Sequence, residues 1–247
     1  MDIVRLENVW KTYSRRASRQ FLRSALTGWF RRRQGKETFH ALRGVSVCVR
    51  EGESWGLVGP NGAGKTTLLS IIAGLTFPDE GSVEVRGRVA ALLELGSGFH
   101  PDLTGAENVV VNASLLGLSR KEVRRRFDQI VEFSGIGEFI DQPLRTYSAG
   151  MVMRLAFSVA MHVEPDVLLI DEVLAVGDQA FQAKCLERIL ALKQAGKAMI
   201  CSSHDTEILR RLCERALWLD HGRVVRSGPL EDVLEAYQAS AVAAPRS

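Results

Sequence analysis

The chain has 247 residues, 46% of them hydrophobic and 25% charged, which suits a globular protein with one large α/β domain or two small ones. No run approaches the 18 apolar residues of a membrane span, and the N-terminus lacks the order of a signal peptide, so we expect a cytoplasmic protein. Residues 14–36 hold eight basic residues and no acid, and subtracting these from the net charge of +3 leaves −5 for the rest.

The first third of the chain is predicted to form short strands. Residues 3–10 and 45–50 alternate between apolar and polar side chains, whereas 53–58 form a short apolar run typical of a buried strand. A tight turn at 78–81 precedes two strand-like runs within 82–93. We expect these segments to form an antiparallel layer beside strand 53–58.

The middle of the chain changes to a helical period. Three helices are predicted, at 107–116, 120–133 and 151–161. Residues 120–126 are basic, but they belong to an amphipathic helix, so we interpret them as a solvated face.

Strands and helices alternate in the last third, which predicts a parallel core sheet. The predicted strands are 167–170, 198–202 and the hairpin 215–220 with 223–226. The predicted helices are 179–194, 206–212 and 230–238, and the tail 241–247 is expected to be frayed.

A phosphate-binding loop is the strongest motif. Gly59-Pro60-Asn61-Gly62-Ala63-Gly64-Lys65-Thr66 matches G-x-x-x-x-G-K-[ST], between strand 53–58 and a helix that starts at Thr67. The glycines let backbone N–H groups converge on one anion, and the positive end of the helix favours phosphate. Lys65 can reach the β- and γ-phosphates, and the Thr66 hydroxyl suits Mg²⁺. The motif predicts nucleoside triphosphate binding rather than a chance glycine-rich turn.

An acidic pair follows the apolar strand 167–170. Asp171 stands at the carboxyl end of that strand, where it can hold Mg²⁺ directly or through water. Glu172 follows it and is placed to polarise an attacking water.

A third motif narrows the class. Tyr147-Ser148-Ala149-Gly150-Met151 opens a helix about twenty residues before Asp171, where Ser148 alone would be an ordinary helix N-cap. With the phosphate loop and the acidic pair, the segment resembles the Leu-Ser-Gly-Gly-Gln signature of ATP-binding-cassette (ABC) ATPases, matching at Ser148 and Gly150. Its departures, together with residues 39–47 and 92–108, resemble the ATPase subunits of bacterial exporters of O-antigen, capsule or teichoic acid.

The resemblance implies a fold and a division of the chain. It implies a single α/β ABC ATPase domain over 1–240, with a parallel core sheet and an antiparallel β layer. It also implies a helical subdomain at about 96–160 and leaves the basic amphipathic segment 14–38 as an insert. Because the sequence ends soon after Tyr237, we expect no added glycan-binding domain.

The resemblance also assigns further site residues. Asp178 ends the segment that matches the family's D-loop, and His204, just past strand 198–202, matches its switch histidine. Tyr13 is the candidate for stacking on adenine, and the family's glutamine contact to Mg²⁺ is missing unless Glu94 makes it. The other histidines and the four scattered cysteines are interpreted as structural, with the cysteines as reduced core thiols.

Partners follow from the same resemblance. It implies a homodimer in which Ser148 and Gly150 of one copy face ATP bound to the phosphate loop of the other, with ATP and Mg²⁺ between them. A separate transmembrane permease would dock around 105–126, at the cytoplasmic face of the bacterial inner membrane, with a lipid-linked glycan as cargo. An ABC ATPase for lipids or drugs, or one outside transport, is the alternative.

The insert has three competing interpretations. Its apolar residues recur on one face of a helix, namely Phe21, Leu22, Ala25, Leu26, Trp29 and Phe30. A helix that binds the membrane surface or the permease explains both these residues and the flanking arginines. A solvated loop is the second interpretation, and nucleic-acid binding is disfavoured because a basic patch alone indicates it weakly.

Overall fold

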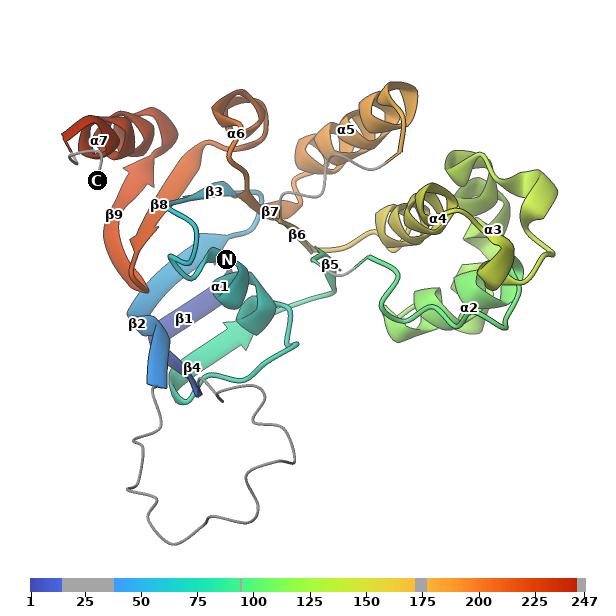
Figure 1. The fold of residues 1–247 in the computed structure, drawn as a ribbon, viewed down its shortest axis with the longest axis horizontal. Helices are drawn as coiled ribbons and strands as arrows, with labels where there is room; N and C mark the ends of the chain where they lie inside the picture. Colours follow the sequence, from blue (N-terminus) through green and yellow to red (C-terminus); the bar gives the residue numbers. More distant parts are fainter. Residues whose placement is uncertain (15–37, 94, 172–176, 244–247) are drawn as a thin grey trace, which may run out of the picture.

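The computed structural model describes residues 1–14, 38–93, 95–171 and 177–243, and Figure 1 shows their arrangement. The strands are β1 (Asp2–Ser14), β2 (Thr38–Arg50), β3 (Ser54–Val58), β4 (Glu80–Val85), β5 (Val89–Leu92), β6 (Val167–Asp171), β7 (Ala198–Ser202), β8 (Arg215–Asp220) and β9 (Arg223–Pro229). The α-helices are α1 (Lys65–Ile72), α2 (Gly105–Leu115), α3 (Arg120–Ser134), α4 (Ala149–Met161), α5 (Gln179–Gln194), α6 (Thr206–Leu212) and α7 (Leu230–Ala243).

The larger sheet has the strand order β5-β6-β7-β3-β8-β9, and only β9 runs antiparallel to its neighbour. Alternate residues of its strands enter different cores. Leu168 and Ile170 pack with residues of α4 to α7, whereas Val167 and Leu169 pack with residues of α1 and the smaller sheet. Because both faces are covered, the central strands β3, β6 and β7 read as nearly continuous apolar runs. The carboxyl ends of the parallel strands meet at one edge of the sheet.

The smaller sheet is antiparallel, with the order β2-β1-β4. Its strands β1 and β2 remain paired up to Ser14 and Thr38, the residues that flank 15–37. Most of the predicted insert, 14–38, therefore lies outside the described residues. The same holds for Glu94 and for 172–176, which include Glu172.

The sequence interpretation of 82–93 was wrong in one respect. Of the two strand-like runs, only β4 joins the antiparallel sheet, whereas β5 lies in the parallel sheet beside β6. Gly87 turns the chain between the sheets with φ +85°, and a Cβ there would lie 2.5 Å from the carboxylate of Asp166. That carboxylate in turn accepts the backbone N–H of Arg88 at 2.9 Å, which fixes the entry into β5.

Helices α2, α3 and α4 pack around a third apolar core, to one side of the sheets in Figure 1. Helix α2 begins at a reciprocal capping box of Thr104 and Glu107, and α3 at one of Ser119 and Glu122. Such boxes satisfy backbone N–H groups that a helix start leaves open. The group occupies the region where the helical subdomain was expected, and the domain boundaries themselves stay a prediction.

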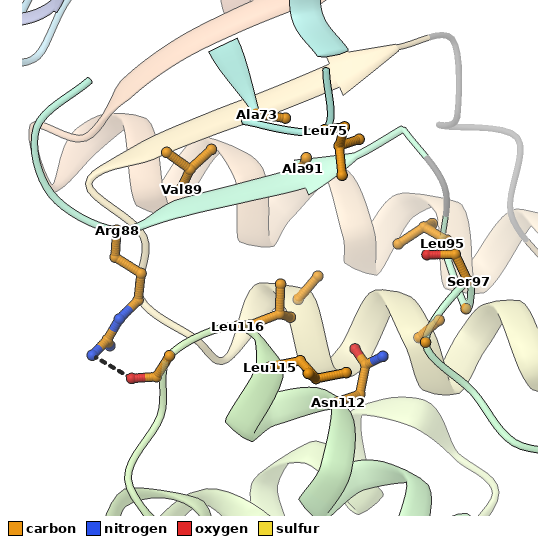
Figure 2. Close-up of a pocket in the computed structure, with 15 residues that line it drawn as sticks. Ala73, Leu75, Arg88, Val89, Ala91, Leu95, Ser97, Asn112, Leu115 and Leu116 are labelled. Atoms are coloured by element: carbon orange, nitrogen blue, oxygen red, sulfur yellow. Dashed lines mark hydrogen bonds between the residues drawn. The ribbon is translucent and has the colours of Figure 1, made fainter. Parts of the chain in front are cut away.

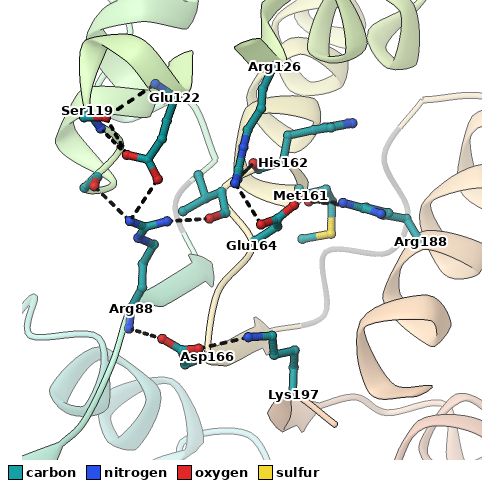
Figure 3. Close-up of polar contacts among 12 residues, drawn as sticks. Arg88, Ser119, Glu122, Arg126, Met161, His162, Glu164, Asp166, Arg188 and Lys197 are labelled. Atoms are coloured by element: carbon teal, nitrogen blue, oxygen red, sulfur yellow. Dashed lines mark hydrogen bonds and ion pairs between the residues drawn. The ribbon is translucent and has the colours of Figure 1, made fainter. Parts of the chain in front are cut away.

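The solvated face predicted for 120–126 was wrong at Arg126, which is buried. Its guanidinium donates to the carbonyl of His162 at 2.6 Å and to Glu164 at 2.8 Å, as Figure 3 shows. A buried charge is tolerated when such partners satisfy it. Arg88 nearby also donates to backbone carbonyl oxygens, those of Val163 and Gly117.

Several smaller predictions can also be compared with the structure. Helix 179–194 and strand 198–202 have the predicted bounds, whereas α7 continues to Ala243, so the expected tail begins inside a helix. Three cysteines are buried as expected, but Cys48 is exposed. Among the described residues, no helix is long and apolar enough to cross a bilayer.

Candidate nucleotide site

The phosphate loop joins β3 to α1, and its glycines are required by geometry. Gly64, the N-cap of α1, has φ +108°, which L side chains rarely adopt. A Cβ there would lie 2.5 Å from the carbonyl oxygen of Ala41 on β2. Gly59 has φ +144°, and a Cβ on it would collide with the backbone of Leu219 on β8. Only glycine at these two positions lets the loop lie this close to both sheets.

Lys65 is the first residue of α1 and is 7% exposed. Its ammonium donates to the carbonyl oxygens of Gly59 at 2.8 Å and Pro60 at 3.1 Å. These bonds hold the charge against the loop whose backbone N–H groups suit an anion. The loop thus combines a fixed cation with the positive end of a helix.

Thr66 and Asp171 meet across the site. The Thr66 hydroxyl donates to a carboxylate oxygen of Asp171 at 2.7 Å, at the carboxyl end of β6. A hydroxyl and a carboxylate are hard oxygen ligands, and Mg²⁺ is usually held by one or two such groups together with phosphates and water. Among the described residues, no group of three or more His, Cys, Asp or Glu side chains could hold a metal ion.

A cavity of about 330 Å³ surrounds these groups. It is lined by loop residues 61–67, Asp171, Ala41 and Phe39. Tyr13, predicted to stack on adenine, is not among the lining residues, but it pairs in register with Phe39 across β1 and β2. Phe39 is 47% exposed, so it offers the cavity an aromatic face that sequence reasoning missed. The cavity lining identifies Phe39, because the resemblance of residues 39–47 gave it no role at the site.

Ser148 and Gly150 lie elsewhere. Ser148 is the N-cap of α4, where its hydroxyl accepts the N–H of Met151 at 3.2 Å. Ser148 and Gly150 are both exposed. Neither lines the phosphate-loop cavity. The structure therefore does not bring the signature-like segment to the phosphate loop of its own chain.

Asp178 and His204 each follow the end of a core strand. Asp178 caps α5 by accepting the N–H of Phe181 at 2.8 Å, seven residues after Asp171. His204 is exposed just beyond β7, whose Ser202 pairs with Asp171. His204 thus lies just past the carboxyl end of β7, at the edge of the sheet where Thr66 and Asp171 meet.

A family model described as ABC transporter matches residues 42–175, more than half of the chain. The chain belongs to the ABC transporter family. That match includes the phosphate loop, Asp171 and the signature-like segment, and it confirms the family predicted from the sequence.

Individual relatives of this ABC chain have names that agree with this family. It is 50% identical to the O-antigen export system ATP-binding protein RfbB of Klebsiella pneumoniae, over 80% of each chain. It is 44% identical to the protein of the same name from Myxococcus xanthus, covering 96% of this chain but 56% of that one. The chain thus spans little more than half of the Myxococcus relative. The predicted resemblance to ATPase subunits of polysaccharide exporters is confirmed by these names.

A solved structure confirms the ABC ATPase fold. The dimeric, post-hydrolysis ATP-binding cassette MJ0796, bound to ADP and Pi, has a TM-score of 0.71 with this chain at 26% identity. The likeness covers 92% of this chain and 98% of that one. The part of this chain that it covers contains strands of the parallel sheet and of the antiparallel sheet, with helices packed on them.

Proposed function

We propose that the chain is the ATP-hydrolysing subunit of a bacterial ABC exporter for a lipid-linked polysaccharide such as O-antigen. The observation that carries this proposal is the Thr66–Asp171 contact beside the Lys65 loop, in a chain half identical to an O-antigen export ATP-binding protein. The loop holds the Lys65 ammonium near the Thr66 hydroxyl and the Asp171 carboxylate. This combination suits the β- and γ-phosphates of ATP with Mg²⁺.

Each group of the site has a role in this proposal. Lys65 and the loop N–H groups bind the phosphates, and Thr66 with Asp171 would hold Mg²⁺. Bound Mg²⁺ would offset negative charge on the phosphates. Glu172, next to Asp171 in the sequence, orients the attacking water and takes its proton, and His204 holds the γ-phosphate. Phe39, with Tyr13 beside it, is placed to cover the base.

A second copy completes the site. The exposed start of α4 carries N–H groups and a positive helix end, but it lies outside the cavity of its own chain. The relative MJ0796 is described as dimeric, which supports a symmetric dimer here. In that dimer Ser148, Gly150 and Asp178 of one copy contact the nucleotide site of the other, so that ATP joins the copies and hydrolysis releases them.

A groove on the helical side is proposed to receive the permease. Figure 2 shows it between β5 and α2, with Leu115 and Leu116 opposite Leu75 and Ala91. Its volume is about 470 Å³, and Leu115 and Leu75 are 70% and 58% exposed. Exposed leucines around a cavity typically mark a docking surface. The occupant would be a short cytoplasmic helix of the permease with an apolar tip, which keeps the chain peripheral at the inner face of the membrane.

Glu172→Gln tests the catalytic part of the proposal. The variant keeps the shape of Glu172 but cannot accept a proton, so it should bind ATP, lose turnover and elute as a dimer when ATP is present. Glu187→Gln, an exposed change on α5, is the matched control and should behave as wild type. A Glu172→Gln protein that stays monomeric with full turnover would contradict both the catalytic role and the dimer.

Leu115→Asp tests the export part. Placing a charge in the groove should abolish co-purification with the polytopic permease, because the carboxylate would have to be buried against apolar surface. Val225→Asp, on exposed β9, is the control. Transport of a labelled lipid-linked oligosaccharide into proteoliposomes then tests the cargo, and transport of a drug or simple lipid instead would overturn the glycan assignment.

A further inference from the structure

Ser202 is a fully buried serine whose hydroxyl is unpaired. It is the last residue of β7, its exposed fraction is 0%, and its Oγ makes no hydrogen bond to any described residue. A buried hydroxyl without a partner destabilises the folded chain, and valine would suit a buried strand better. A serine at this position therefore calls for a reason other than packing.

The register of the parallel sheet puts Ser202 beside Asp171. The two residues are direct partners across β6 and β7, and Leu57 of β3 is the partner of Ser202 on the other side. Leu169 and Ile200, two positions earlier in the same strands, pack in the core shared with α1. Because side chains alternate along a strand, Ser202 and Asp171 face α1 as well. Adjacent strands lie about 4.8 Å apart, so rotation about χ1 can bring the hydroxyl to the carboxylate.

Ser202 can act on a bound nucleotide only through Asp171. It does not line the phosphate-loop cavity, whereas Asp171 and Thr66 do, and Thr66 donates to Oδ2 of Asp171. In the proposed function, on which this inference rests, Thr66 and Asp171 together hold Mg²⁺. Carboxylates that hold a metal ion are usually fixed in turn by hydrogen bonds from neighbouring groups, which set their orientation. Ser202 is a described side chain placed to donate such a bond.

We propose that Ser202 is a positioning residue for Asp171, and that its hydroxyl donates to the carboxylate when the site holds Mg²⁺ and ATP. The hydroxyl then strengthens Mg²⁺-dependent binding, although it costs stability in the protein without nucleotide. These opposite effects distinguish the role from simple filling of the core, because a residue that only fills the core has no reason to change the affinity for Mg²⁺.

Ser202→Ala tests the role by binding rather than by turnover. The Kd of a fluorescent, non-hydrolysable ATP analogue is measured in Mg²⁺ and again in EDTA. The variant should bind about 10- to 100-fold more weakly than wild type in Mg²⁺, the usual loss when a group that orients a metal ligand is removed, and equally well in EDTA. Its thermal midpoint without nucleotide should be no lower than that of wild type, because the unpaired hydroxyl is gone.

Ser54→Ala is the matched control. Ser54 is also fully buried with an unpaired Oγ, but it is the first residue of β3, at the opposite edge of the sheet from Asp171. This variant should keep the wild-type Kd in Mg²⁺ and in EDTA. Ser202→Thr retains the hydroxyl and should restore the affinity in Mg²⁺, with thermal melting to check that it folds.

Three results would overturn the role of Ser202. They are an unchanged Kd of Ser202→Ala in Mg²⁺, an equal loss in Ser54→Ala, and an equal loss in folded Ser202→Thr. Failure of the proposed function is seen separately, in the wild type. A wild type that binds no better in Mg²⁺ than in EDTA would refute the metal role of Thr66 and Asp171, and the role of Ser202 with it.

Discussion

The hydroxyl of Thr66 donates a 2.7 Å hydrogen bond to the carboxylate of Asp171, although the two residues are 105 positions apart. The contact exists because β6 and β3 lie in one parallel sheet, separated only by β7, with their carboxyl ends at one edge. It brings the two oxygen ligands predicted for Mg²⁺ within reach of a single ion.

Asp171→Asn should therefore impair hydrolysis more than binding. The amide keeps the size of the carboxylate but loses its charge, so kcat should fall on the order of 100-fold and the Mg²⁺ concentration for half-maximal activity should rise. Chelating Mg²⁺ with EDTA should abolish turnover of the wild type. Steady-state ATPase assays across Mg²⁺ concentrations measure both effects. Asp166→Asn, at the opposite end of β6, should show no such Mg²⁺ dependence, and equal behaviour of the two variants would refute the metal role.

Lys65→Ala should weaken ATP binding. The ammonium is held against the loop by the carbonyl oxygens of Gly59 and Pro60, so its charge lies where the phosphates are expected. Losing one charge-assisted contact should raise the Kd about 10- to 100-fold. Equilibrium binding of a fluorescent ATP analogue measures this change, with Lys197→Ala as a control remote from the loop. An unchanged Kd in Lys65→Ala would show that the lysine does not contact the nucleotide.

Arg126→Met should destabilise the protein. The change leaves the buried carbonyl of His162 without its 2.6 Å donor, at a cost of about 1–3 kcal/mol in the free energy of unfolding. Arg125→Met, one position away and exposed, should change it by no more than about 0.5 kcal/mol. Urea titrations followed by circular dichroism compare the two. Equal midpoints would mean that the buried guanidinium contributes nothing.

Stability should also depend on pH through His162. Burial lowers the pKa of His162 below its usual value, and nearby Arg188 and Arg126 lower it further. The unfolded chain then binds the proton more readily, so the stability from the neutral ring is full above pH about 6.5 and is lost as pH falls through the lower folded pKa. His162→Gln should be less stable at neutral pH but should lose less stability on acidification. Parallel loss in both proteins between about pH 7.5 and 5.5 would exclude His162 as the source.

The sequence predicted what is local and missed what depends on pairing. The phosphate loop and the strand ending at Asp171 were predictable because each motif is contiguous and sits between recognisable elements. The partner sheet of β5 was not, because Val89–Leu92 is short and apolar enough for either sheet. Arg126 was misplaced because helical periodicity cannot reveal a carbonyl contributed by His162, 36 residues away.

The aromatic wall of the cavity illustrates the same limit. The resemblance pointed to Tyr13 because it follows the strand predicted at 3–10. In the structure Tyr13 lies within β1, and the residue that lines the cavity is its cross-strand partner Phe39. Register between β1 and β2 includes several irregularities, so counting residues along the sequence could not give this pairing.

The pairing of Ser14 with Thr38 has a practical consequence for engineering. Two paired strand ends can be joined by a tight two-residue turn such as Asn-Gly without altering the ladder behind them. The 23 residues numbered 15–37 can thus be replaced by such a turn, and the trimmed chain would retain every described strand of both sheets. Comparing the ATPase activity and export of the trimmed chain with those of the full chain would show which of the two activities needs the basic insert.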